Sequence, residues 1–297
     1  MKCVVGVDLE RRSGTAIDLL GRLQFSLDET LLVHVTEPAQ LTMPYSAYGM
    51  FAETDQIYDM LRKSGENVLA EANVEAVKQN LNPKTEMCEG FPTATLCERA
   101  DQIGASLIAV SSTVRGTISA VFGGSVARGL TIAAHQSVLV AREDALTDEP
   151  IRAVFATDQS PYCGECVKEI VKFAPKGISH LTLLTVHERA KHEHHLSLIR
   201  HNDAHRVMEE AHQNLTDRGN DIAKWLSESG IPTNSIVESG HVDEMIHKTM
   251  KETKANLLIV GSQGHGFLDR VMVGSVSLHQ VISERYPVLL LRIPKAH

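Results

Sequence analysis

The chain has 297 residues, which suggests two domains of ordinary size, and either half alone is long enough to bury a core. Asp and Glu number 37 against 29 Lys and Arg, and the resulting formal charge of −8 argues against a protein that binds nucleic-acid backbones over a broad surface. The hydrophobic content of 43% and the charged content of 22% are those of a folded, water-soluble protein.

The N-terminal residues do not look like a secretory signal, because only five uncharged residues separate Lys2 from Asp8. No stretch reaches the roughly 18 apolar residues that span a bilayer, so we expect no membrane insertion. We therefore expect a cytoplasmic protein. Its five cysteines should be mostly reduced there, and an odd number fits no closed disulfide framework.

Short apolar runs alternate with longer amphipathic segments through the first half, a pattern that predicts β-α-β units with a parallel sheet covered on both faces. The predicted strands are 3–7, 30–35, 84–88, 106–110 and 137–141. Residues 38–54 show no period and predict a long loop, and a helical pattern follows over 55–80. The polar, acidic segment 143–150 is the natural linker.

The second half repeats this order of elements. Its predicted strands are 152–156, 180–186, 234–238, 256–260 and 287–291, and its longest helical pattern is 205–229. Residues 107–126 align without a gap under 257–276 at an offset of 150, and the same offset pairs Asp8 with Asp158. Duplication of one module is the simplest account, so the sequence predicts an α/β protein with domains at 1–142 and 151–297.

A glycine-rich loop follows the fourth predicted strand of the second half. The apolar run 257–260 leads into GSQGHG at 261–266, and Gly274-Ser275 then opens a helix. A backbone that wraps an anion turns several N–H groups inward, often at positive φ, which glycine permits. A helix start adds unpaired N–H groups and the positive end of the helix dipole. The sequence therefore predicts a phosphate site, with Ser275 as a further donor or as the helix cap.

The spacing Gly-x2-Gly-x9-Gly-Ser, with Asp158 after the first strand of a five-strand module, resembles the universal stress protein family. The resemblance covers nearly the whole chain as two tandem copies. It implies two Rossmann-like (adenine nucleotide alpha hydrolase-like) parallel-sheet domains of strand order 3-2-1-4-5, related by a pseudo-twofold axis and paired through their last strands. It also implies an adenine nucleotide at the carboxyl ends of strands one and four, where the strand order reverses.

Carried over to this sequence, the family's site places Asp158 at the ribose or adenine, with Thr157 beside it. Val186, at the end of the second strand, is expected to offer backbone hydrogen bonds to the base. The residues expected around the phosphates are Val260, Gly261, Gln263, Gly264, Gly274, Ser275, Val276 and Ser277. Read singly, Asp158 is more simply an ordinary turn cap and Gly274-Ser275 an ordinary helix start, whereas read jointly, in register with the family, they favour nucleotide binding.

The first copy departs from this pattern. Ser111 stands in place of Gly261 and Val114 in place of Gly264, although the first copy keeps Asp8 and the pair Gly124-Ser125. A β-branched Val resists positive φ and adds bulk where the phosphates pass. We therefore expect one competent site, in the second half, and a degenerate counterpart in the first.

Cys163 and Cys166 form a Cys-x-x-Cys motif at the start of a predicted helix. A thioredoxin-like redox site is placed in the same way. In that interpretation the helix N-terminus lowers the pKa of the Cys163 thiol and makes it the nucleophile. The first copy has no cysteines here, so the module does not need them.

Thirteen of the 15 histidines lie in the second copy, many of them between His187 and His212. Together with Cys163 and Cys166 they form a conceivable zinc site, although the spacings match no standard zinc finger. A solvated loop that titrates with pH is the alternative interpretation, and the metal question stays open.

We therefore expect a stress-response protein that binds ATP, or ADP or AMP, with Mg²⁺ as an open question. Its bound nucleotide would alter the surface offered to an unidentified protein partner, so it acts as a sensor or adaptor. The Walker-type Gly-x4-Gly-Lys-Ser/Thr is absent, so we expect no enzyme beyond slow ATP hydrolysis. The alternatives are a thiol redox protein and a partner-binding pseudo-dimer without nucleotide. A homodimer of whole chains is compatible with each of them.

Overall fold

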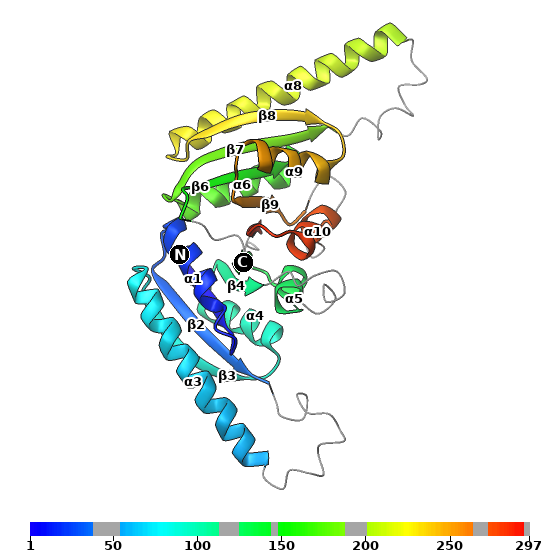
Figure 1. The fold of residues 1–297 in the computed structure, drawn as a ribbon. Helices are drawn as coiled ribbons and strands as arrows, with labels where there is room; N and C mark the ends of the chain where they lie inside the picture. The colour runs from blue at the N-terminus through cyan, green and yellow to red at the C-terminus, as the bar shows by residue number, and fades with distance from the viewer. Residues whose placement is uncertain (38–53, 113–124, 144–147, 188–200, 264–272, 294–297) are drawn as a thin grey trace.

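The computed structural model describes residues 1–37, 54–112, 125–143, 148–187, 201–263 and 273–293, with the backbone alone at 54–58 and 201–205. These residues form an α/β protein in which helices cover both faces of one long sheet (Figure 1). Within this part of the chain, no helix has the length and apolar character needed to cross a membrane.

All five strands predicted in the first half are confirmed within two residues. The elements are β1 Lys2–Val7, α1 Ser13–Leu23, β2 Glu29–Thr36, α3 Thr54–Lys78, β3 Pro83–Glu89, α4 Pro92–Ile103, β4 Leu107–Ser112, α5 Ser125–Ala133 and β5 Ser137–Arg142. The strands are rich in β-branched and aliphatic residues, which suit a sheet buried on both faces.

The second half repeats these elements in the same order, which confirms the predicted duplication of the fold. They are β6 Ile151–Thr157, α6 Pro161–Phe173, β7 Ile178–His187, α8 His201–Glu228, β8 Thr233–Ser239, α9 Val242–Glu252, β9 Leu257–Gly261, α10 Ser275–Ser283 and β10 Val288–Leu291. The predicted loop at 38–54 lies outside the described residues except for Thr54, which begins α3.

The ten strands form a single sheet of order β3-β2-β1-β4-β5-β10-β9-β6-β7-β8. Each half therefore has the expected order 3-2-1-4-5, and the second reads in reverse. Every described strand pair is parallel except β5 with β10, where Leu139 stands opposite Leu289. A reversed order with an antiparallel central pair is what a pseudo-twofold axis between two copies produces.

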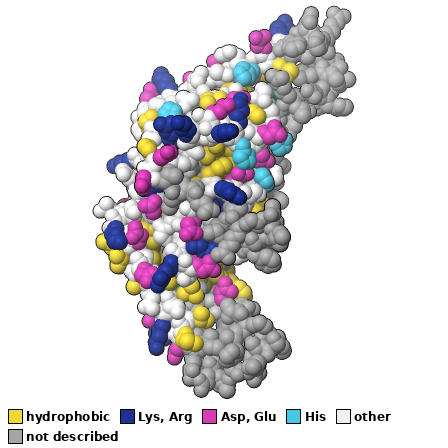
Figure 2. Space-filling view, in the orientation of Figure 1, with side chains coloured by type: hydrophobic (Ala, Val, Ile, Leu, Met, Phe, Trp, Pro, Cys, Tyr) yellow, Lys and Arg dark blue, Asp and Glu magenta, His cyan; other side chains and the backbone are white. Residues whose placement is uncertain are grey.

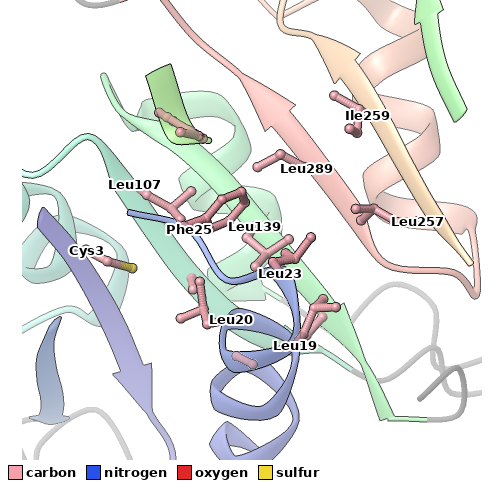
Figure 3. Close-up of a cluster of buried hydrophobic side chains, with 14 of the residues drawn as sticks. Cys3, Leu19, Leu20, Leu23, Phe25, Leu107, Leu139, Leu257, Ile259 and Leu289 are labelled. Carbon is pink, nitrogen blue, oxygen red and sulfur yellow. The ribbon is translucent and has the colours of Figure 1, made fainter. Parts of the chain in front are cut away.

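Two hydrophobic cores lie on opposite faces of this sheet. Helices α1, α3, α6 and α8 cover one core, and α4, α5, α9 and α10 cover the other. The first core crosses the junction between the halves, where Leu139 of one half lies beside Leu289 of the other (Figure 3). Burying one such leucine stabilises a fold by about 1.5–3 kcal/mol.

Reciprocal backbone bonds join the two halves on the side of α1 and α6. The Ser26 N–H donates to the Phe173 carbonyl at 3.1 Å, and the Gly177 N–H donates to the Leu23 carbonyl at 3.0 Å. Beside them the rings of Phe25 and Phe173 meet edge to face, with centroids 5.5 Å apart. The loops that follow α1 and α6 thus pack directly on each other.

Two buried arginines join the halves on the opposite side, beside α5 and α10. Arg142 donates to the Val281 carbonyl in the last turn of α10, and Arg292 donates to the Thr131 carbonyl in the last turn of α5. Cations are favoured at helix C-termini because of the helix dipole. Burial lowers the pKa of Arg142 to about 10, so the side chain stays charged at neutral pH.

Candidate functional site

The candidate site lies where β6 and β9 end side by side in the sheet. Ala156 of β6 pairs with Val260 of β9, so Thr157 and Gly261 leave the sheet at neighbouring positions. On the other side of β6, Thr157 pairs with Thr185 of β7, and Val186 follows. The fold therefore brings together the predicted positions from three strands, at the point where the strand order reverses.

A tight turn carries Asp158 at the end of β6. The Asp158 Oδ1 accepts a hydrogen bond from the Ser160 N–H at 2.9 Å, and the Thr157 hydroxyl oxygen accepts one from the Gln159 N–H at 3.0 Å. Ser160 caps α6, because its hydroxyl oxygen accepts from the Cys163 N–H. Asp158 is therefore a turn cap, as the simpler interpretation expects, and its half-buried side chain lies beside the ends of β6 and β9.

Hydrogen bonds join the residues before the glycine-rich loop to those after it. The Gly274 N–H donates to the Ser262 carbonyl at 2.8 Å, and the Ser277 hydroxyl donates to the Gly261 carbonyl at 2.7 Å. Ser262 also lies 2.5 Å from the Tyr162 hydroxyl, and Gln263 is buried. Gly264 and the residues after it to 272 lie outside the described part of the chain.

The helix that follows this loop starts without a side-chain cap among the described residues. Gly274 occupies the cap position of α10, so the expectation that Ser275 caps the helix was wrong. Ser275 is exposed in the first helical position, Val276 is half-buried, and Ser277 is buried. The first N–H groups of a helix have no partner within the helix and favour an anion. The start of α10 therefore offers a suitable phosphate position.

The first copy uses the corresponding polar groups internally. Asp8 accepts hydrogen bonds from the Arg12 N–H at 2.8 Å and from Arg12 Nε at 2.9 Å. The Ser111 hydroxyl oxygen accepts from the Ala16 N–H at 3.0 Å, which ties the end of β4 to the first turns of α1. Ser125 begins α5 and is exposed. Val114 and Gly124 lie outside the described residues.

The Cys-x-x-Cys motif is buried. Cys163 is 3% exposed and Cys166 is fully buried, both on the inner side of α6. Burial, followed by the nearby Asp158 carboxylate, raises the pKa of the Cys163 thiol to about 11, and burial also raises the pKa of Cys166. The expectation that the helix N-terminus lowers the Cys163 pKa was wrong, because desolvation of the thiolate outweighs the helix dipole.

Native thiol reactivity is expected to follow this burial. With a pKa of about 11, Cys163 is only about one part in a thousand thiolate at pH 8. We expect an aromatic disulfide reagent at that pH to modify the half-buried Cys88 and Cys97 first, and Cys163 and Cys166 only after unfolding. Mass spectrometry of the labelled peptides gives the order. Rapid native labelling of Cys163 would contradict the burial argument.

The histidines of the second half gather on its surface, as the space-filling view shows for one face (Figure 2). His187 ends β7 and His212 is exposed on α8, while residues 188–200 lie outside the described part. Across the described residues, no group of three His, Cys, Asp or Glu side chains could hold a metal ion. The zinc hypothesis therefore has no support from Cys163 and Cys166 with described histidines.

Sequence reasoning missed the residues that support the Asp158 turn. The Gln159 side chain donates to the Thr185 hydroxyl at 2.9 Å and to the Leu215 carbonyl of α8 at 2.8 Å, and Arg218 donates to the Gln159 carbonyl at 3.0 Å. The contacts to α8 join residues 56 and 59 positions apart. No sequence pattern marked them, because they depend on how α8 packs on the sheet.

This architecture, two Rossmann-like modules joined through their last strands, defines a tandem α/β protein. The sequence model of the Universal stress protein family matches residues 1–142 and 152–292. The chain belongs to that family.

Similar proteins agree with this membership. Universal stress proteins of Mycobacterium tuberculosis (strain ATCC 25618 / H37Rv) and Mycobacterium bovis (strain ATCC BAA-935 / AF2122/97) are each 26% identical over 278 residues, covering 88% of this chain and 86% of the relative. The crystal structure of a universal stress protein from Archaeoglobus fulgidus DSM 4304 aligns with a TM-score of 0.68 at 19% identity, over 98% of both chains. That structure supports the fold.

Proposed function

We propose that this protein binds ATP, or ADP or AMP, in its second module (151–297), and that the first module (1–142) has lost this activity. The nucleotide lies across the carboxyl ends of β6 and β9, with its ribose near Asp158 and its phosphates toward α10. The base lies toward Val186 at the end of β7. Binding alters the surface offered to a protein partner, so the protein acts as a sensor or adaptor.

One observation carries this proposal: the start of α10 lacks a side-chain cap among the described residues, and it opens beside Gly261 at the strand-order reversal. Phosphate groups suit such a helix start because its N–H groups and dipole favour negative charge. Gly274 leaves room close to the backbone, since a Cβ there would have no neighbour nearer than the Ser262 carbonyl oxygen at 3.7 Å. In the described part of the chain, the starts of α1, α4 and α9 also lack a side-chain cap, and Ser160 caps α6, so it is the place of α10 at the strand-order reversal that sets its start apart.

The direct experiment identifies what the protein carries. Purified protein is denatured, and the released small molecules are separated and identified; the expected result is an adenine nucleotide. Calorimetric titration with ATP, ADP and AMP, each with and without Mg²⁺, then ranks the nucleotides and tests the ion. Protein that releases no adenine compound and binds none in titration would overturn the proposal.

The duplication supplies a matched pair of variants. Asp158→Ala is expected to weaken ATP binding about tenfold or more, because a charged hydrogen bond to the ribose is lost. Asp8→Ala makes the same change in the first module, where Arg12 already holds the carboxylate, and should leave ATP affinity unchanged. Gly264→Val, which copies Val114, is expected to abolish binding with little loss of stability. Equal effects of Asp158→Ala and Asp8→Ala would contradict the assignment.

The other two functions make different predictions. A thiol redox protein needs an accessible thiolate, whereas Cys163 and Cys166 are buried with raised pKa values. A partner-binding pseudo-dimer without nucleotide predicts no adenine compound in the released fraction. Sedimentation with and without ATP tests whether whole chains pair further.

A further inference from the structure

The turn at the end of β6 contains a residue in an unusual backbone conformation. Gln159 has φ of 53°, in the left-handed region that residues with a Cβ enter at a cost of about 1–2 kcal/mol. Such a residue persists where its surroundings hold it, and these positions gather at ligand sites. The Gln159 side chain is only 5% exposed, so its surroundings are the protein interior.

The carboxamide of Gln159 fastens this turn to two neighbouring elements. Its Nε2 donates to the Thr185 hydroxyl of β7 at 2.9 Å and to the Leu215 carbonyl of α8 at 2.8 Å. Arg218, one turn further along α8, donates to the Gln159 carbonyl at 3.0 Å. Gly219 lets α8 approach, since a Cβ there would lie 3.4 Å from Gln159 Nε2 and closer still to Ser235 Oγ.

The first copy lacks the two side chains that anchor this turn. The residue at the Gln159 position is Leu9, which is 41% exposed, and Val68 of the core stands in place of Arg218. There the neighbouring Asp8 is paired with Arg12 instead. The anchored turn therefore occurs only in the module that we propose to bind nucleotide.

We propose that Gln159 is a positioning residue of the nucleotide site: anchored to β7 and α8, it fixes the turn that presents Asp158 to the ribose. The inference rests on the proposed function and names the device that sets the ribose contact. In this proposal Gln159 acts through Asp158 and does not contact the nucleotide itself. Arg218 of α8 helps to hold the same turn through its hydrogen bond to the Gln159 carbonyl.

The test separates the ribose side of the site from the phosphate side. Gln159→Gly keeps a residue that adopts φ of 53° freely and removes the carboxamide. Adenosine and ATP are expected to bind about tenfold more weakly, whereas tripolyphosphate, which we place at the start of α10 and away from the Asp158 turn, binds as before. Leu9→Gly, the glycine substitution at the corresponding position of the first module, should change neither affinity.

The affinities of Arg218→Met for adenosine and tripolyphosphate give a second measurement. Lys224→Met is its control, because Lys224 carries the same charge on the exposed side of α8. Faster hydrogen exchange of the Ser160 amide in Gln159→Gly, without nucleotide, reports the loosened turn directly. Unchanged adenosine affinity in Gln159→Gly, or an equal loss for adenosine and tripolyphosphate, overturns the inference while the proposed function stands. Wild-type protein that binds none of these ligands overturns both.

Discussion

Gly177→Ala is expected to lower the free energy of unfolding by about 3 kcal/mol or more, which is about 5 °C or more in melting temperature for a chain of 297 residues. A Cβ at this position would overlap the Arg22 carbonyl oxygen and lie 2.8 Å from its carbon. Because the atoms that this Cβ would meet belong to the Arg22 backbone, no side-chain rotation relieves the contact. The loop after α6 must then move away from α1, which breaks the two reciprocal bonds of Ser26 and Gly177.

Gly164→Ala is the matched control for this experiment. Gly164 lies within α6, and a Cβ there would meet nothing within 4 Å. Alanine is favoured over glycine inside a helix by about 1 kcal/mol, so this variant should be slightly more stable than the wild type. Chemical denaturation of both variants gives the comparison. A Gly177→Ala protein as stable as the wild type would mean that the loops between the halves do not pack as described.

Gly261→Ser is expected to destabilise the second module by about 1–3 kcal/mol, and Cys166→Ala is expected to restore most of that loss. A Cβ at Gly261 would lie 3.2 Å from the Cys166 sulfur, and the added hydroxyl needs further space. The first copy shows the alternative solution, since Ser111 there faces Ala16 and accepts a hydrogen bond from its N–H. In the second copy Gly261 therefore lies against the larger Cys166, whereas in the first copy Ser111 lies against the smaller Ala16.

A double-mutant cycle measures this exchange through denaturation of wild type, both single variants and the double variant. We expect a coupling energy of about 1 kcal/mol or more that favours the double variant. Gly164→Ser is the control, because a Cβ there would meet no neighbour within 4 Å and the substitution should be nearly neutral. Additive effects of Gly261→Ser and Cys166→Ala would mean that Cys166 does not occupy the space beside Gly261.

The fold could be predicted from the sequence because its pattern is repeated and local. Apolar runs such as 137–141 and 287–291 marked the strands, and the offset of 150 residues placed the ten strands in two equal sets. The pairing of β5 with β10 came from the family resemblance and is confirmed, and the structure shows that this pair is antiparallel. The features that could be predicted were therefore the strands and helices that each segment specifies by itself, and the arrangement that the two copies share.

The site could be predicted only in part, since its details depend on contacts between distant segments. The sequence placed Asp158 and Gly261 at neighbouring strand ends, yet it gave no sign of Gln159, whose partners lie on α8. It also gave the wrong direction for the Cys163 pKa, because a helix start is visible in sequence and burial is not. The cap of α10 differed by one residue, since Gly274 takes the position expected of Ser275.

The antiparallel pair of β5 and β10 has a consequence for how this protein can evolve. In a pair of separate chains, identical halves meet by diffusion, and dilution separates them. Here only a short connector lies between Arg142 and Ile151, so the effective local concentration of one half around the other is about millimolar whatever the amount of protein. Mutations that remove a ligand contact in one half therefore leave the two halves paired, because the pairing of β5 with β10 does not depend on those contacts.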